Sequence, residues 1–348
     1  MMRADSRLPA GAGLAALAVL AVAGWLLDPR ALLACWLAAC WFWAGTLMGG
    51  LANVWLHNLT GGAWGEAIRA PLLQAARRVP LACLLFLPLL AGVALLYPWA
   101  APGGTALWHE TLTAPAFKAW WLARPFFTLR ALACLALWSA LSWLARRPGL
   151  ERSPAFSAFA LLAYGFSMSV AAFDWIMSLQ PEWYSSVFGW LAASGQMLSG
   201  LALALGLADR EASRRVLPDL GNLLLMYVLV WTYLAYVQFL IIWSADLPHE
   251  IAWYLRRSSP GWIAVAWTLL AGHFAAPLLI LLSRRAKRAP RLLGMLAWGV
   301  LAAHLLDCWW LIVPGAGALS PHWLWLAPLL ALALGVLLVP FRKEVSHG

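Results

Sequence analysis

The side chains of this chain that could do chemistry lie within its most apolar stretches. Asp174 is an acid inside a run that otherwise has the composition of a membrane helix. On such a helix Tyr164 and Ser167 share the face of Asp174, because they precede it by ten and seven residues. A carboxylate in hydrocarbon is costly, so it marks either a function or a paired structural contact. The spacing predicts a thin polar stripe that runs inward from one membrane surface.

Further polar groups follow toward the C-terminus. They are Gln238, His273 and the pair His304 and Asp307, which is three residues apart and shares one helix face. Three interpretations stay open. These groups form a proton half-channel or a quinone-adjacent network, they fasten helices together as structural pairs, or the histidines ligate a b-type haem. His273 and His304 provide ligands for at most one haem, without the repeated pair of a di-haem bundle.

The sequence predicts no catalytic residue, no metal ligand and no cofactor-binding residue in this chain. The cysteines lie in apolar runs without C-x-x-C spacing, which disfavours disulfide staples and thiolate metal sites. The C-x-x-C-H motif that attaches c-type haem is also missing from the sequence. The five cysteines are Cys35, Cys40, Cys83, Cys134 and Cys308.

The composition identifies an integral membrane protein. Hydrophobic residues make up 64% of the 348 residues and charged residues only 11%, against about 25% charged residues in soluble domains. The net charge of +10 would suit a nucleic-acid partner, but the basic residues lie in the connections between apolar runs. Membrane topology therefore explains this charge, and no nucleic-acid partner is predicted.

Ten apolar runs predict an all-α polytopic membrane protein that forms a single integral membrane domain over residues 1–348. We expect helix one at 11–27, a four-helix bundle over 31–179, a second bundle over 185–313, and helix ten at 323–340. The predicted spans are 11–27, 31–56, 80–99, 126–145, 155–179, 185–207, 220–244, 261–282, 292–313 and 323–340.

The basic residues predict the orientation. Five lie in connections on one side of the predicted spans, namely Arg30, Lys118, Arg124, Arg256 and Arg257, and Arg130 falls near the start of the fourth span. The other 18 of the 24 basic residues lie on the side of the termini. The positive-inside rule therefore places both termini in the cytoplasm.

Three local patterns predict packing. Gly45 with Gly49, and Gly195 with Ser199, are small-residue pairs that permit close helix approach. The segment after Gly65 predicts a short amphipathic helix on the cytoplasmic surface. Two similar stretches, 120–125 and 253–260, share tryptophan, arginine and proline before a span, which suggests two parallel repeats.

Three stretches resemble the ActF family, a membrane subunit of bacterial alternative complex III. They are FDWIMSLQPEWYSSVFG at 173–189, DLGNLLLMYVLVWTYLAYVQFLIIWSADLPHEIAWYLRR at 219–257, and HNLTGGAWG at 57–65. The resemblance extends from about residue 32 to 314. It implies a ten-helix subunit of the NrfD/polysulfide-reductase type in the bacterial inner membrane, within a quinol:cytochrome c oxidoreductase.

The resemblance also implies partners and candidate residues. A homologous NrfD-like quinol-binding subunit would lie beside this chain, and iron–sulfur and cytochrome c subunits would carry the redox centres. Quinone or quinol is the small molecule implied. Carried over to this sequence, the proton-path or quinone-adjacent candidates are Asp174 and Gln238, with His304 and Asp307 matched more loosely. Two alternatives stay open: a secondary transporter with a midplane substrate site and a purely structural membrane anchor.

Overall fold

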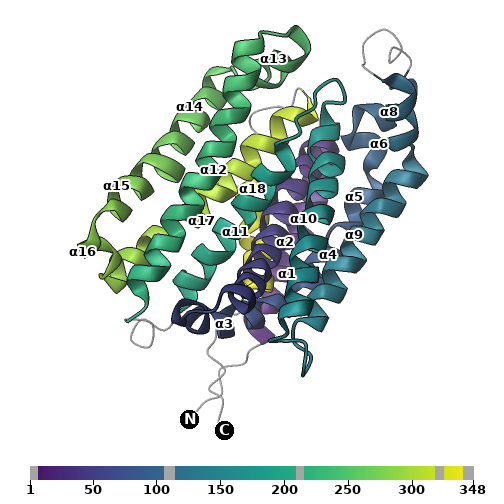
Figure 1. The fold of residues 1–348 in the computed structure, drawn as a ribbon. Helices are drawn as coiled ribbons and strands as arrows, with labels where there is room; N and C mark the ends of the chain where they lie inside the picture. Colours follow the sequence, from purple (N-terminus) through teal and green to yellow (C-terminus); the bar gives the residue numbers. More distant parts are fainter. Residues whose placement is uncertain (1–6, 106–113, 209–214, 318–324, 340–348) are drawn as a thin grey trace.

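The chain folds into a bundle of long, nearly parallel helices (Figure 1). A computed structural model describes residues 7–105, 114–208, 215–317 and 325–339, and every regular element in these ranges is a helix. The longer helices are α1 Arg7–Leu27, α2 Pro29–Thr60, α3 Ala63–Ala76, α9 Arg124–Leu144, α10 Pro154–Trp175, α11 Phe188–Leu207, α12 Leu217–Ala245, α14 Pro260–Leu269, α17 Pro290–Ile312 and α18 Leu326–Leu338.

Short helices complete the described part of the chain. They are α4 Val79–Leu84, α5 Leu87–Ala91, α6 Val93–Leu96, η1 Pro98–Ala100, α8 Pro115–Trp121, η2 Met177–Leu179, α13 Pro248–Leu255, η3 Leu270–Ala275, α15 Ala276–Leu282, α16 Arg284–Lys287 and η4 Val313–Ala316. The tryptophan-containing stretches before α9 and α14 form the short helices α8 and α13, at one end of the bundle (Figure 1).

The protein is a multi-pass membrane protein. Seven described helical segments are long and apolar enough to cross a membrane, and an eighth is added if the bent pair Ala63–Ala76 and Val79–Ala91 forms one span. The all-α prediction is therefore confirmed. The predicted count of ten is not reached by this criterion, since Gly11–Leu27 and Leu326–Leu338 are shorter apolar helices.

The predicted third span, 80–99, is wrong as a continuous helix. The structure divides it into α4, α5, α6 and η1. Pro80, Pro88 and Pro98 each begin a new element at its first or second position, because proline fixes φ and lacks the N–H that continues a helix. Gly92 separates α5 from α6. The helix before this segment, α3, is present as predicted and is bent by 44° from the segment after it.

Helix α2 forms the centre of the molecule, and its most apolar 18-residue window is entirely buried. Asp28 caps its first turn by accepting a hydrogen bond from the Ala31 amide at 2.9 Å. Helix α11 crosses α2 so closely that a Cβ added at Gly49 would lie 1.9 Å from the Gln196 carbonyl oxygen. On the facing helix, a Cβ added at Gly200 would lie 2.2 Å from the Gly50 amide nitrogen. Gly49 and Gly200 therefore permit the close approach of α2 and α11, whereas Gly195 of the predicted pair faces His304 of α17.

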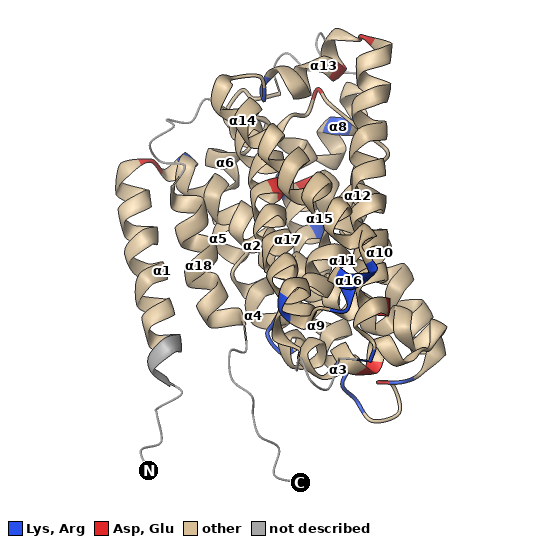
Figure 2. Cartoon of the chain, turned by 90° about the vertical axis from the view of Figure 1, so that its left-hand side faces the viewer, with Lys and Arg blue, Asp and Glu red and all other residues tan. Residues whose placement is uncertain are grey.

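Helices α1 and α18 form one flank of the bundle, as Figure 2 shows. The Trp43 indole of α2 donates to the Ala331 carbonyl of α18 at 2.7 Å, which joins this flank to the centre. Helix α1 begins and α18 ends toward the end of the bundle where α3 and α16 lie (Figure 2). Many Lys and Arg residues lie at that same end (Figure 2), as the positive-inside rule predicts for a cytoplasmic face.

Candidate functional site

Asp174 of α10 is paired with Arg130 of α9. The guanidinium donates from Nε to Oδ2 at 2.8 Å and from Nη2 to Oδ1 at 2.9 Å, and the Trp121 indole donates to Oδ1 at 2.8 Å. Asp174 is buried. This bidentate geometry is the strong form of an ion pair. Asp174 therefore lies inside the bundle, and its carboxylate accepts three hydrogen bonds from Arg130 and Trp121.

Aromatic rings enclose this ion pair. The Arg130 guanidinium carbon lies 4.0 Å from the Trp121 ring centroid and 4.3 Å from that of Phe126. Such cation–π contacts gain strength when they are shielded from water. Trp121 therefore both donates to the acid and covers the base.

The other side of Trp121 faces a pocket of about 420 Å³ between α8 and the 173–184 region. Aromatic side chains dominate its lining, with Phe117, Phe173 and Tyr184 among them, and Ser178 also lines it. Lys118 lies in the same wall and donates to the Pro181 carbonyl at 2.7 Å. Partial burial lowers the pKa of Lys118, opposed by the nearby Glu182 carboxylate. Trp121 thus lines this pocket and also donates to Asp174.

The predicted stripe of Tyr164, Ser167 and Asp174 shares one buried face, but the three side chains contact different partners. The Trp138 indole donates to Ser167 at 3.0 Å, and the Tyr164 hydroxyl donates to Gln196 at 3.0 Å. The stripe therefore fastens α10 to α9 and to α11, and no continuous hydrogen-bonded chain links its described members.

A second buried cluster joins α17 to the helix of His273. His304 Nδ1 lies 3.6 Å from Asp307 Oδ2, and the ring centroids of His304 and His273 are 5.7 Å apart. The Cys308 sulfur lies 3.7 Å from His304 Nε2. Both nitrogens of His273 and Nδ1 of His304 are buried without a hydrogen bond in the described part of the chain. The structure thus brings the predicted histidines and acid together.

Local features of the backbone place these rings. His273 lies in the π-helical turn η3, whose extra residue shifts the side chain relative to α14 and α15. Its ring contacts Trp231 of α12, with centroids 4.1 Å apart. A Cβ added at Gly195 would lie 2.6 Å from His304 Cε1, so glycine at this position makes room for the imidazole.

Gln238 lies away from both clusters, at the junction that joins α12 to the 176–185 connection. Its Oε1 accepts from Ser185 at 3.0 Å. Burial raises the pKa of Tyr254 to about 12, opposed by a hydrogen bond with Gln238. Sequence reasoning grouped Gln238 with the histidines, and the structure assigns it to this separate junction.

Arg257 is the centre of that junction, and it was not among the candidate residues predicted from the sequence. Its guanidinium donates to the Trp310, Trp253 and Leu311 carbonyls at 3.0, 2.7 and 2.7 Å and to Gln180 Oε1 at 3.2 Å. The side chain is 3% exposed, and no carboxylate pairs with it among the described residues. A cation on the last carbonyls of α17 compensates their partial negative charge.

Arg130 and Asn53 are further polar residues that sequence reasoning passed over. Asn53 donates to the Gly49 and Met197 carbonyls at 2.9 Å and accepts from the Tyr227 hydroxyl at 2.8 Å. It therefore locks the α2–α11 crossing to α12. Its signal was available, as an amide in a strongly apolar run.

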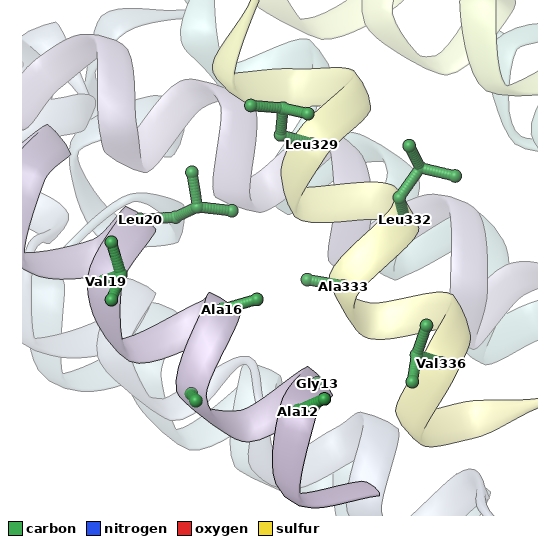
Figure 3. A pocket seen from close by; sticks show the side chains of 10 residues that line it. Ala12, Gly13, Ala16, Val19, Leu20, Leu329, Leu332, Ala333 and Val336 are labelled. Carbon is green, nitrogen blue, oxygen red and sulfur yellow. The ribbon is translucent and has the colours of Figure 1, made fainter. Parts of the chain in front are cut away.

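A hollow of about 580 Å³ lies in the groove between α1 and α18. Figure 3 shows Ala16 and Leu20 on one wall and Leu332 and Ala333 on the other. All of its lining side chains are apolar or glycine. The groove can accommodate hydrocarbon, but its lining offers no side-chain donor or acceptor for chemistry.

No protein-family model matches this chain, and no curated protein matches its sequence. No group of three or more His, Cys, Asp or Glu residues within the described ranges is arranged to hold a metal ion. The functional argument therefore depends on the two buried clusters, the junction at Arg257 and the sequence stretches that build them.

Proposed function

We propose that this chain is a non-haem membrane subunit of a quinol-oxidising respiratory complex in the bacterial inner membrane, with both termini in the cytoplasm. The observation that carries the proposal is that the two long ActF-like stretches pack against each other. Trp183 of the first stacks on Trp253 of the second at 4.0 Å, and Gln180 accepts from Arg257. Residues that carry the resemblance thus build one structural unit.

The partners follow from the same resemblance. A homologous NrfD-like subunit would bind quinol, and iron–sulfur and cytochrome c subunits would pass the electrons to cytochrome c or another acceptor. This chain supplies no electron carrier in the proposed scheme. Its contribution is to couple quinol oxidation to proton movement, or to position the quinol-binding neighbour.

The proposed proton-handling group is the cluster of His273, His304 and Asp307. Intramembrane histidine and aspartate side chains are typical of proton relays. Both ring nitrogens of His273 lack a hydrogen bond in the described part of the chain, so this ring can take up a proton without first breaking a structural pair, whereas His304 lies against Asp307 and Cys308.

We assign the quinone-adjacent role to the pocket that Trp121 lines, and not to Asp174 itself. Arg130 and Trp121 already occupy the carboxylate, whereas the pocket beyond Trp121 combines aromatic walls with Ser178 and Lys118. An amphipathic ring suits such a lining, because ligand sites are mostly apolar with a few placed polar groups.

One observation favours the alternative of a secondary transporter. Transporter sites lie where membrane helices are irregular near the midplane, and η3 is a π-helical turn at His273 within the continuous helical segment Pro260–Leu282. Transport by the purified chain in liposomes, without partner subunits, would favour this alternative over the respiratory one.

The test is purification of the tagged chain from its own membranes in a mild detergent. We expect haem c and iron–sulfur proteins in fixed ratio to the chain, together with quinol oxidation by the purified assembly. A chain that purifies intact without any redox-active partner contradicts the proposal.

A further inference from the structure

The outward face of α12 carries a regular seam of exposed side chains. In Figure 2, α12 stands at one edge of the molecule. Its exposed large side chains recur with alternating spacings of three and four residues. The residues with this spacing are Met226, Leu229, Tyr233, Tyr236, Leu240, Trp243 and, just past the helix, Leu247, and they are flanked by the exposed side chains of Val230, Phe239 and Ile241.

The spacing of this seam is that of a helix–helix interface. An alternation of three and four residues averages 3.5, which is the repeat that keeps one stripe facing a second helix. From Met226 to Trp243 the seam extends about 26 Å at 1.5 Å per residue. That length approaches the thickness of the hydrocarbon core, about 30 Å.

Two seam residues have polar groups at membrane depth. The midpoint of α12 is residue 231, so Tyr233 and Tyr236 lie about 3 and 8 Å beyond it along the helix. Their side chains are 64% and 57% exposed, and neither hydroxyl has a hydrogen-bond partner within the described ranges. Interfacial tyrosines belong at the membrane surface, which these two positions do not reach.

The buried tyrosines of this chain provide the comparison. Tyr97 donates to the Trp175 carbonyl at 2.9 Å, Tyr164 to Gln196 and Tyr227 to Asn53, while Tyr254 bonds Gln238. Each tyrosine that the fold encloses therefore has a partner. Lipid tails offer none, so a phenol facing them stays unsatisfied at a cost in free energy.

We propose that this α12 seam is the docking surface for a transmembrane helix of a different subunit. The occupant is an apolar helix that carries Ser, Thr, Asn or Gln acceptors opposite Tyr233 and Tyr236. Small residues beside those acceptors admit the two aromatic rings. The inference identifies a surface for a partner subunit, and it holds for any membrane assembly whatever its redox chemistry.

The first test places the photo-crosslinker p-benzoylphenylalanine at position 233, 236 or 240 of the full chain in its own membranes. The matched control position is Phe166, a mid-span aromatic of α10 that is 76% exposed. We expect adducts from the seam positions to map to one apolar segment of one other subunit, stepping along that segment with the position used. The control position is expected to give lipid adducts.

The second test uses Tyr233→Phe with Tyr236→Phe, which removes two hydroxyls and keeps both rings. We expect the fraction of the chain found in the larger assembly to fall roughly five- to ten-fold, the effect of two interhelical hydrogen bonds within a membrane. Phe166→Ala should leave that fraction unchanged. Normal folding of both variants is checked by the melting of the isolated chain.

Lipid adducts alone at the seam positions, adducts between two copies of this chain, or an unchanged assembled fraction in the double variant would each overturn the inference. A crosslinked partner complex that lacks redox centres would support the docking surface and contradict the respiratory proposal. The docking surface on α12 and the respiratory function can therefore be contradicted independently of each other.

Discussion

Two buried polar clusters of this protein differ in how completely they are paired. At Arg130 and Asp174 both carboxylate oxygens accept short hydrogen bonds, aromatic rings cover the guanidinium, and only Nη1 of Arg130 has no hydrogen bond among the described residues. At His273 and His304, three of the four ring nitrogens have no hydrogen bond in the described structure. This difference shows which buried ionisable residues are candidates for proton exchange. They are those whose side chains have no hydrogen-bond or charge partner in the folded chain.

The largest effect on stability is expected from substitutions that break the ion pair of Arg130 and Asp174. Arg130→Leu or Asp174→Leu leaves one buried charge alone, and we expect each to lower the free energy of unfolding by about 3–5 kcal/mol. The measurement is equilibrium unfolding in mixed micelles. In a double-mutant cycle the combined variant should lose less than the sum of the two. Single variants as stable as the wild type would show that the pair does not hold α9 to α10.

A somewhat smaller effect is expected at the junction between α13 and α17. Arg257→Met leaves four acceptors without their charged donor, and we expect a loss of about 3 kcal/mol. The neighbouring Arg256→Met is the matched control, because its ion pair with Glu182 is partly exposed and such pairs contribute about 0–1 kcal/mol. Equal losses from both variants, in the same unfolding assay, would refute the central role of Arg257.

A smaller effect still is expected from crowding the histidine cluster. Gly195→Ala puts a methyl group against His304, and we expect a loss of about 1–3 kcal/mol. Gly299→Ala is the control on α17, where an added Cβ meets nothing within 4 Å; its thermal melting should equal or exceed that of the wild type. If the two alanine variants melt alike, His304 does not pack on α11 as described.

The smallest effect on stability is expected for His273, whose ring makes no hydrogen bond in the described structure. His273→Phe puts an apolar ring in place of a buried ring that makes no hydrogen bond. The free energy of unfolding should therefore change by less than about 1 kcal/mol, or rise slightly. A loss as large as that of Asp174→Leu in the same assay would show that His273 is as structural as the ion pair.

The sequence carries a signal for the pairing of Arg130 with Asp174. Arg130 and Asp174 are the charged residues of two consecutive predicted spans, four residues after the start of one and five before the end of the next. Antiparallel neighbours place such positions at one depth, about 6–8 Å from the same surface. Equal depth was therefore a usable signal for their pairing.

Other features depend on packing that a sequence pattern does not specify. Gly45, Gly49 and Gly195 predicted close helix approach, but only the fold shows that α2 and α11 approach each other. The segment 80–99 has the hydropathy of a membrane span, but its prolines divide it into short helices. The π-helical turn at His273 depends on contacts with α12 and α17 that have no local sequence signature.

The most direct test of the account measures protons released per quinol oxidised by the assembled complex in liposomes. For His273→Phe we expect proton-coupled turnover to fall roughly a hundred-fold, the lower end of what one acid–base group contributes, while the assembly stays intact. For Asp174→Leu we expect loss of assembly. Wild-type proton release with His273→Phe would contradict the assignment of proton handling to this cluster.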